Sequence, residues 1–334
     1  MINVGVIGYG YWGPNMVRNF YGNKDARVAW VCDLSKDRLK LVEAGYPTVK
    51  TTTDYKDILK DSGVDAVVIS TPVSAHFPLA QEALEAGKHV LLEKPMTSTV
   101  EQSEKLVELA EKKKRTLMVD HTFLYTGAVR KMKELVESGE LGDIYYFDSV
   151  RVNLGLFQHD VNVIWDLAPH DFSIMDFLLQ KDPEMVSAVG MCHLGDLENI
   201  AYVTVQYPGN LLGHLHVNWL APVKVRTTLI GGTRKMIVYD DNEPSEKIKI
   251  YDKGVSYSDK KEDVYQMLVQ YRSGDMLAPK LEPSEALKLV SKEFTDSINE
   301  NRKPLTDGVA GLRVVKLLES ANESIKQKGK VIKL

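Results

Sequence analysis

The sequence predicts two domains: a doubly wound α/β domain built on a parallel sheet, followed by an α+β domain. Three observations predict this. A glycine-rich turn follows the first apolar run, strand and helix patterns then alternate over residues 1–120, and short alternating segments separated by turn residues follow. The 334 residues are typical of about two domains. We place the first domain at 1–121 and the second at 122–305, with a helix at about 308–328 returning to brace the first.

The composition is that of an ordinary globular chain. Apolar residues make up 44% and charged residues 26%, and the net charge is −4, which is ample for a core. The basic run Lys112–Arg115 is interpreted as the solvated end of a helix, where cations are favourable. We therefore expect no nucleic-acid partner.

The chain is expected to be cytoplasmic and without a membrane span. It has no apolar run of about 18 residues, and a strand predicted to begin at Ile2 leaves no room for a signal peptide. The two cysteines, Cys32 and Cys192, lie far apart and predict neither a disulfide framework nor a metal site.

The stretch after the first strand, Ile2–Ile7, has the pattern of a dinucleotide-binding turn. It reads Gly8-Tyr9-Gly10-Tyr11-Trp12-Gly13 before a helical pattern. Gly8 and Gly10 permit a tight turn and a close approach to a ligand, and Gly13 lets the helix pack on the strand. Free N–H groups at the start of that helix favour a pyrophosphate. The alternative is a glycine-rich turn without a ligand, but the strand before and the helix after favour a Rossmann nucleotide site.

An acidic residue ends the second apolar run, Val28–Cys32. The carboxylate of Asp33 can accept hydrogen bonds from both hydroxyls of an adenosine ribose, and its charge would repel a 2′-phosphate. The sequence therefore favours NAD over NADP as the cofactor. Lys36 and Arg38 are either solvated helix residues or, if the loop bends, phosphate ligands. The candidate cofactor residues of this region are Gly8, Gly10, Tyr11, Trp12, Gly13, Asp33 and Arg38.

The elements after Asp33 continue the alternation. Asp54 suits a helix cap, and Gly87 closes a helix. Helices are expected at Lys36–Ala44, Asp54–Lys60, Pro78–Ala86 and Val100–Lys114, and strands at Asp65–Ser70, His89–Glu93 and Thr116–Val119. Parallel strands present their carboxyl ends at one edge, so the groups that follow them face the glycine turn. These groups are Thr71-Pro72, Glu93-Lys94-Pro95 and Asp120-His121.

The second domain is predicted to be a row of antiparallel strands, a meander. Turns such as Pro208-Gly209-Asn210 and Gly231-Gly232 separate its segments. One helix, Pro169–Leu179, interrupts the series, because Pro169 suits the first helical position. The expected strands are Ile144–Val152, Val186–Cys192, Asn199–Tyr207, Leu211–Leu220, Val225–Ile230, Lys235–Tyr239 and Lys247–Tyr251, with further helices at Ala128–Ser138 and Ala310–Lys328.

Two side chains suit proton and charge transfer. Lys94, at a strand end, can hydrogen-bond a reacting oxygen, although a surface lysine before a proline is equally common. His170 can accept the proton of a hydroxyl that is being oxidised. Asp166, one helical turn earlier, could orient its ring, and Asp171 could serve the helix N-terminus. On spacing alone, a capping or core histidine is the more common explanation of His170.

Other residues could line the site or simply pack. Arg151, Asn162 and Trp165 flank His170 and could read a sugar or a phosphate, or could be ordinary loop residues. His76 and His121 follow strand ends, with packing at least as common an explanation; we group His121 with the candidate substrate residues. Neither a nucleophile elbow nor metal-ligand spacing is present.

Taken together, the motifs resemble the Gfo/Idh/MocA oxidoreductases, relatives of glucose–fructose oxidoreductase and inositol dehydrogenase. The resemblance rests on the glycine turn, Thr71-Pro72 with His76, Glu93-Lys94-Pro95, and Asp166 with His170, and it covers nearly the whole chain. It implies a Rossmann domain followed by an α/β domain on an open, mostly antiparallel sheet, through which members often form dimers and tetramers. It also implies oxidation or reduction of sugar or cyclitol carbons with NAD(P).

The resemblance implies roles for individual residues. Lys94 and His170 correspond to the catalytic pair, with Asp166 beside them. Residues expected at or near the nicotinamide end of the cofactor are Thr71, Pro72, His76, Glu93 and Lys94. The sequence departs from the common pattern at Leu124, Ala168 and Ser173, where many members have arginine, glycine and aspartate.

The segment from Arg151 to Asp171 resembles a subgroup of nucleotide-sugar oxidoreductases, similar to UDP-N-acetylglucosamine 3-dehydrogenases and their uronate counterparts. We therefore expect hydride transfer at C3 of a UDP-sugar, by a homodimer or homotetramer assembled through the C-terminal sheet. The alternatives are a cyclitol dehydrogenase of the inositol type, an NAD-using glycosidase, and a regulator that binds NAD without turnover.

Overall fold

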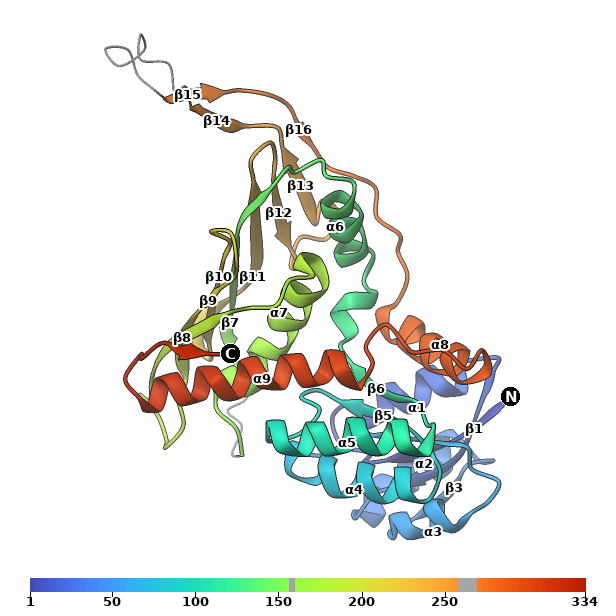
Figure 1. The fold of residues 1–334 in the computed structure, drawn as a ribbon. Coiled ribbons are helices and arrows are strands. Elements are labelled where there is room, and N and C mark those ends of the chain that lie inside the picture. The colour runs from blue at the N-terminus through green and yellow to red at the C-terminus, as the bar shows by residue number, and fades with distance from the viewer. Residues whose placement is uncertain (156–159, 258–268) are drawn as a thin grey trace. The chain divides into compact units, whose positions relative to one another are not determined.

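The computed structural model describes residues 1–155, 160–257 and 269–334. The chain divides into two compact units, each with a sheet of its own (Figure 1). Unit 1 comprises Met1–Thr126 and Ser284–Glu319, and unit 2 comprises Gly127–Pro283 and Ser320–Leu334. The division falls within helix α9 (Gly308–Lys326).

Unit 1 contains the predicted doubly wound sheet. Its strands lie in the order β3-β2-β1-β4-β5-β6, and every neighbouring pair is parallel. The apolar runs form the buried strands, as in β4, where all four residues are buried. The strands are β1 (Ile2–Ile7), β2 (Ala26–Cys32), β3 (Lys50–Thr52), β4 (Ala66–Ile69), β5 (His89–Glu93) and β6 (Leu117–Asp120).

The predicted caps of unit 1 are present at Asp54 and Gly87, but the predicted helix start at Pro78 is wrong, because α4 (Val73–Glu85) begins at Val73 and contains Pro78. The side chain of Asp54 accepts a hydrogen bond from the Lys56 N–H, which confirms the predicted cap. Gly87, with φ of +77°, follows the end of α4, and α4 runs beside α5 (Figure 1). The helices are α1 (Gly13–Tyr21), α2 (Lys36–Gly45), α3 (Tyr55–Lys60), α4 (Val73–Glu85), α5 (Val100–Lys113), the 3-10 turn η1 (Thr122–Tyr125) and α8 (Ala286–Asn299).

Helix α8 belongs to unit 1, although the sequence patterns above do not predict it. It packs against α1 and η1. Leu287, Val290 and Phe294 form its buried face, and the Phe294 ring meets the Phe20 ring of α1 edge to face, with centroids 6.1 Å apart.

Unit 2 contains a mixed, mostly antiparallel sheet in the order β16-β13-β12-β11-β7-β10-β9-β8-β17. The prediction of strands paired in chain order is wrong for β7 (Ile144–Leu154), which lies between β11 and β10 and runs parallel to β10. The reason is that helix α7 follows β7, so the chain crosses over before the next strands form. The other strands are β8 (Met185–Met191), β9 (Ile200–Gln206), β10 (Leu212–Asn218), β11 (Leu220–Gly232), β12 (Met236–Asp240), β13 (Ile248–Tyr251), β16 (Met276–Leu277) and β17 (Ile332–Lys333), with β14 (Gly254–Tyr257) and β15 (Val269–Arg272) as a separate pair.

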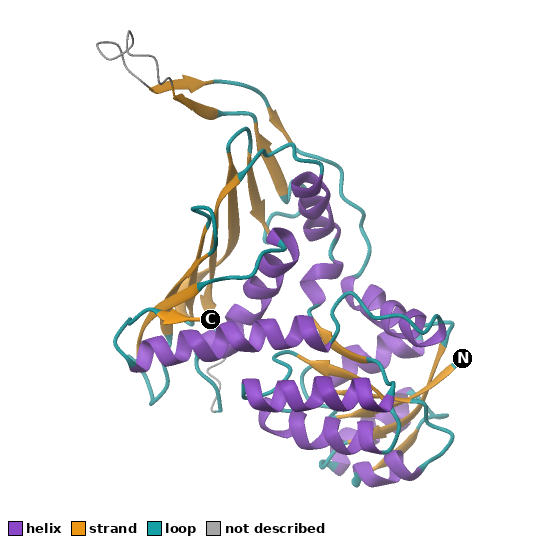
Figure 2. Ribbon diagram, viewed as in Figure 1, coloured by secondary structure: helices purple, strands orange, loops and turns teal. Residues whose placement is uncertain are grey.

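Helices α6 (Gly127–Glu137) and α7 (Val163–Leu179) pack against each other beside this sheet (Figure 2). The predicted start of α7 at Pro169 is wrong: Oδ1 of Asn162 accepts the Trp165 N–H at 3.2 Å and caps the helix earlier. Pro169 lies inside the helix, where it cannot donate to the Trp165 carbonyl. His170 is therefore a mid-helix residue. No helix in the described part of the chain is long and apolar enough to cross a membrane.

Candidate active site

In the glycine turn of unit 1, a side chain would collide with the backbone at two of the glycines, whereas the third has space around it. Gly8 has φ of +97°, and a Cβ there would lie 2.6 Å from the Ser70 carbonyl oxygen. A Cβ on Gly13 would lie 2.3 Å from the Gly8 carbonyl oxygen. By contrast, a Cβ on Gly10 would meet only Nη1 of Arg38, at 3.7 Å. The turn thus has the space over Gly10 that a pyrophosphate needs.

The carboxylate of Asp33 is held by this turn. Its Oδ2 accepts the Tyr9 N–H at 2.7 Å, and its Oδ1 accepts the Ser35 N–H at 2.8 Å. Oδ1 can accept a further hydrogen bond and remains able to receive a ribose hydroxyl, whereas Oδ2 also lies within hydrogen-bond reach of Arg38. The half-exposed Arg38 places Nη1 at 3.5 Å from Oδ2. The structure therefore brings Asp33, Arg38 and Gly10 together.

Three further observations fit a nicotinamide dinucleotide at this turn. The rings of Tyr11 and Trp12 are exposed, with centroids 5.4 Å apart. Thr71 lies next to the turn, since its methyl group is 3.0 Å from the place where a Cβ on Gly8 would be. The buried Oγ1 of Thr71 has no hydrogen-bond partner among the described residues, so a polar ligand group would satisfy it. The residues present fit the cofactor that the sequence predicts.

The ends of neighbouring strands bring the other predicted residues of unit 1 to the same edge. β1, β4, β5 and β6 are adjacent and parallel, so the residues that follow them share the carboxyl edge. These residues are Gly8, Thr71, Pro72, Lys94 and His121.

Glu93 and Asp120 form a buried acidic pair at this edge. They are register partners on β5 and β6, and Oγ1 of Thr122 donates to Oδ1 of Asp120 at 2.8 Å. Burial and the neighbouring Asp120 raise the pKa of Glu93 to about 8, and burial raises the pKa of Asp120 to about 6. Near neutral pH, the pair therefore holds one proton and one negative charge. The charge of Lys94 lowers both pKa values, so the ammonium lies within electrostatic reach of the pair.

His76 connects two of the strand-end turns. Its Nδ1 lies 2.9 Å from the Pro95 carbonyl oxygen and its Nε2 2.8 Å from that of Thr71. Burial lowers the pKa of this imidazole. The neutral ring has one N–H, so it donates to one of these two oxygens, and its contact with the Pro95 carbonyl lies next to Lys94 in the chain.

His121, predicted to contact substrate, is 1% exposed. Burial, followed by the charge of Lys94, lowers its pKa to about 3, so the ring is neutral. Neither ring nitrogen has a hydrogen-bond partner within the part of the chain that the structure describes.

Helix α7 of unit 2 carries Asp166 and His170 one turn apart, so the two side chains project from one face. Oδ2 of Asp166 accepts a hydrogen bond from Nε1 of the buried Trp219 at 3.0 Å. Ser173, in the position where many relatives were expected to have aspartate, donates from Oγ to the His170 carbonyl at 2.8 Å. The indole therefore holds the Asp166 carboxylate on the face that carries His170.

Arg151 forms a buried ion pair inside unit 2. Its Nε and Nη2 donate to the two carboxylate oxygens of Asp171 at 2.7 and 3.0 Å, and Ser149 also donates to Asp171. Arg151 is 3% exposed and Asp171 1%. The prediction that Asp171 could serve the helix N-terminus is wrong, because Asp171 lies within α7 and pairs with β7.

Asn162 and Trp165 also have internal partners. Asn162 caps α7, and its Nδ2 donates to Glu198 at 2.9 Å and to Asn322 at 3.0 Å. Trp165 is buried. No group of His, Cys, Asp and Glu side chains suited to a metal ion is found among the described residues.

The roles of two residues of the site were not predicted from the sequence. Asp120 was noted only as a strand-end residue, although the adjacent strand ends at Glu93 could have suggested the pair. Trp219, from another part of unit 2, holds Asp166 through a contact that no spacing reveals.

The fold and the dinucleotide turn define an NAD-binding oxidoreductase with a second, sheet-based unit. Residues 2–121 match the family described as "Oxidoreductase family, NAD-binding Rossmann fold", and residues 129–238 match the "GFO/IDH/MocA C-terminal domain". The chain belongs to the Gfo/Idh/MocA oxidoreductase family.

Three relatives illustrate the range of similar proteins. The uncharacterized oxidoreductase YdgJ of Escherichia coli (strain K12) is 36% identical over 181 residues, about half the length of each chain. The scyllo-inositol 2-dehydrogenase (NADP(+)) IolW of Bacillus subtilis (strain 168) is 25% identical over 347 aligned residues, covering 98% of this chain and 94% of IolW. The UDP-N-acetylglucosamine 3-dehydrogenase of Acidithiobacillus ferrooxidans is 27% identical over 330 residues and 94% of both chains.

A solved structure of the Acidithiobacillus ferrooxidans enzyme, GnnA, has the same fold. It superposes with a TM-score of 0.81 at 24% sequence identity and covers 98% of both chains.

Proposed function

We propose that this protein is an NAD-dependent oxidoreductase that moves a hydride between nicotinamide and a hydroxyl-bearing sugar carbon, C3 of a UDP-sugar. The observation that carries the proposal is the position of Lys94. It follows β5 at the carboxyl edge of the Rossmann sheet, the edge that also carries the glycine turn, in a chain of this oxidoreductase family.

The proposed mechanism gives each residue one task. NAD, when bound, accepts the hydride. His170 takes the proton of the substrate hydroxyl, and Asp166, fixed by Trp219, steadies the resulting imidazolium. Lys94 donates a hydrogen bond to the same oxygen, where negative charge develops. Glu93 and Asp120 position Lys94, since the pair holds one proton and one negative charge beside it.

Two substrate classes have support among the relatives. The UDP-N-acetylglucosamine 3-dehydrogenase aligns over 94% of both chains and favours a nucleotide sugar. IolW aligns over a similar share and favours a cyclitol as the second candidate. Arg151 and Asn162 have internal partners, so we assign them to the support of α7 rather than to the first contacts of the substrate.

The test is the absorbance of NADH with a panel of UDP-sugars and inositols. The proposal expects NADH to form with a UDP-sugar, and an inositol as the sole substrate would favour the cyclitol alternative. Cleavage of a glycoside without net NADH would favour the NAD-using glycosidase. Tight NAD binding without turnover of any panel member would favour the regulator.

Cofactor preference is part of the proposal. The carboxylate of Asp33 lies at the turn and favours NAD, whereas the nearby Arg38 could balance a 2′-phosphate. We expect a lower Kd for NAD than for NADP, measured by fluorescence titration.

We also propose a homodimer or homotetramer assembled through the sheet of unit 2. Exposed side chains on its strands include Tyr145, Tyr202 and Leu212, and the rings of Tyr202 and His216 stack with centroids 4.4 Å apart. Light scattering of the purified protein tests this, and a monomer at micromolar concentration would contradict it.

A further inference from the structure

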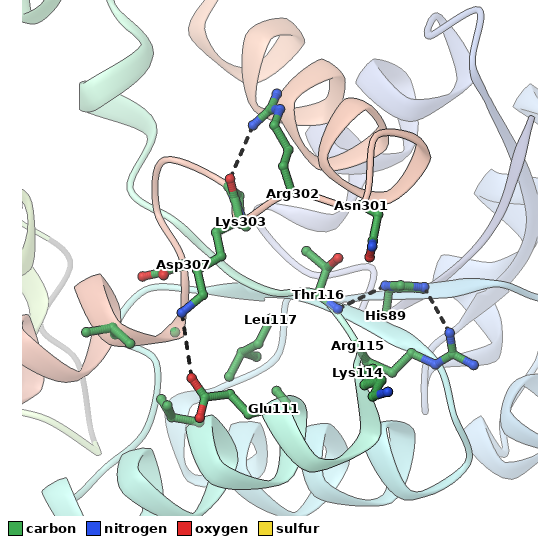
Figure 3. Close-up of a pocket in the computed structure, with 15 residues that line it drawn as sticks. His89, Glu111, Lys114, Arg115, Thr116, Leu117, Asn301, Arg302, Lys303 and Asp307 are labelled. Atoms are coloured by element: carbon green, nitrogen blue, oxygen red, sulfur yellow. Dashed lines mark hydrogen bonds and ion pairs between the residues drawn. The ribbon is translucent and has the colours of Figure 1, made fainter.

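A cavity of about 250 Å³ lies in unit 1 at the amino ends of β5 and β6. This is the sheet edge opposite to the glycine turn, because His89 begins β5 and Leu117 begins β6. Figure 3 shows His89, Lys114 and Arg115 on one side of the cavity and Lys303 and Asp307 on the other. The cavity is thus separate from the proposed cofactor site.

The basic run at the end of α5 reaches this cavity. Lys113 is already used, since its Nζ donates to the Glu85 carbonyl at 3.1 Å. Lys114 has φ of 54° and ends the helix, and it lines the cavity together with Arg115.

Most other charges around the cavity are balanced. Arg302 donates to Glu293 and to Glu300, each at 2.7 Å. Lys303 lies 3.6 Å from Glu111.

The remaining wall carboxylate, Asp307, accepts the Ala310 N–H at the start of α9. Lys114 and Arg115 have no carboxylate within ion-pair distance in the described ranges of the chain. Lys114 and Arg115 are therefore wall cations that form no ion pair within the described residues, and Asp307 is a wall carboxylate held by a backbone N–H.

The imidazole of His89 adds a third donor. Its Nδ1 accepts the Thr116 N–H at 2.9 Å, and a backbone N–H can only donate. Burial, followed by the charge of Arg115, lowers the pKa of His89 to about 4, so the neutral ring carries its proton on Nε2. That nitrogen lies 3.5 Å from Nη1 of Arg115. Two N–H donors cannot satisfy each other, whereas one acceptor oxygen lying between them would satisfy both.

We propose that this cavity binds a phosphate group, as inorganic phosphate or as a phosphomonoester. Lys114 and Arg115 supply the charge, and Arg115 and His89 Nε2–H supply converging hydrogen bonds to its oxygens. The volume lies just below the range of about 300–1,000 Å³ that holds drug-sized ligands, which suits a small anion. The site does not depend on the proposed reaction.

The test is isothermal titration of the full chain with inorganic phosphate, in saturating NAD so that the glycine turn is occupied. The double variant K114Q/R115Q removes the two cations from exposed positions, and K112Q removes one charge from the same run outside the cavity. The proposal expects binding to weaken about tenfold or more in K114Q/R115Q and to change less than about twofold in K112Q.

A spectroscopic readout locates the ligand. In a ¹⁵N-labelled sample, phosphate is expected to shift the Thr116 amide and the His89 ring signals in the wild type and not in K114Q/R115Q. No binding at millimolar phosphate, equal weakening in K112Q and the double variant, or unchanged His89 signals on binding would each overturn the proposal. A phosphomonoester that binds at least as tightly as phosphate identifies an organic ligand, and phosphate alone identifies the free ion; either supports the site.

Discussion

The glycine turn of unit 1 is shaped by its backbone, whereas the polar groups around α7 of unit 2 are shaped by side-chain pairs. In the turn, added Cβ atoms on Gly8 and Gly13 would lie within 2.6 Å of carbonyl oxygens. Around α7, Asp171 is paired with Arg151, and Asp166 accepts from Trp219. Substitutions that add atoms to the glycines should therefore disturb the turn. Substitutions that remove a pairing partner should disturb the polar groups around α7.

The largest expected effect is on turnover. Lys94→Met and His170→Gln are each expected to lower kcat by about two to four decades, because each removes a proposed contact to the reacting oxygen. The Kd for NAD should change little, since the glycine turn is intact. Stopped-flow absorbance and NAD titration measure the two quantities. Lys112→Met, at an exposed position, is the matched control, and unchanged turnover in both variants would remove the proposed roles.

The second effect is on the stability of unit 2. Arg151→Met leaves the buried Asp171 without its cation and should reduce the free energy of unfolding by about 3–5 kcal/mol. The double variant Arg151→Met/Asp171→Leu should recover most of this loss, because no unpaired charge remains. Urea denaturation gives the values. A single variant as stable as the wild type would contradict the stabilising role of the Arg151–Asp171 pair and would leave Arg151 as a candidate substrate residue.

The third effect separates the two roles of the turn glycines. Gly13→Ala forces a clash with the Gly8 carbonyl and should cost about 1–3 kcal/mol of stability. Gly10→Ala meets no backbone and should leave stability unchanged, yet weaken NAD binding about tenfold or more by filling the pyrophosphate space. Thermal unfolding and NAD titration test this pair. Normal NAD affinity in Gly10→Ala would mean that the cofactor does not approach the turn.

The smallest effect is a pH dependence of stability. The pKa of Glu93 is raised to about 8, so the folded protein retains a proton that the unfolded chain loses near pH 4.5. This contribution is complete below pH 4.5 and is lost as pH rises through about 8. The Tm of the wild type relative to Glu93→Gln should therefore fall between about pH 5 and 8 and stay level above that. The raised pKa of Asp120 acts in the same direction as that of Glu93, and the low pKa of His121 acts in the opposite direction below its unfolded value. Both groups are present in both proteins, so the difference in Tm reports mainly on Glu93.

A pH-independent difference in Tm between the wild type and Glu93→Gln would mean that Glu93 is ionised in the folded state. In that case the proposed charge balance beside Lys94 would fail.

The difference between the two regions also explains which parts of the candidate site could be predicted from the sequence. Gly8, Gly10, Gly13 and Asp33 act through backbone conformation and a fixed spacing, so their arrangement could be predicted. The cap at Asp54 was predictable for the same reason.

Around α7 the decisive partners are distant in sequence. Asn162 meets Asn322, and Asp166 meets Trp219, so neither contact could be found by spacing. Pro169 suggested a helix start. The helix begins earlier, because Asn162 caps it and the apolar residues before Pro169 are buried as part of α7. The central place of β7 likewise depends on pairing with β10 and β11, which follow much later in the chain.

The most direct test of the account is the fate of a deuterium label. The UDP-sugar that forms NADH in the panel would be prepared with deuterium at C3 and incubated with the wild-type protein and NAD. The account predicts that the deuterium appears in NADH by mass spectrometry, and that His170→Gln and Lys94→Met slow its appearance. NADH that forms without the label would contradict transfer from C3, and label transfer at the wild-type rate in both variants would contradict the assigned residues.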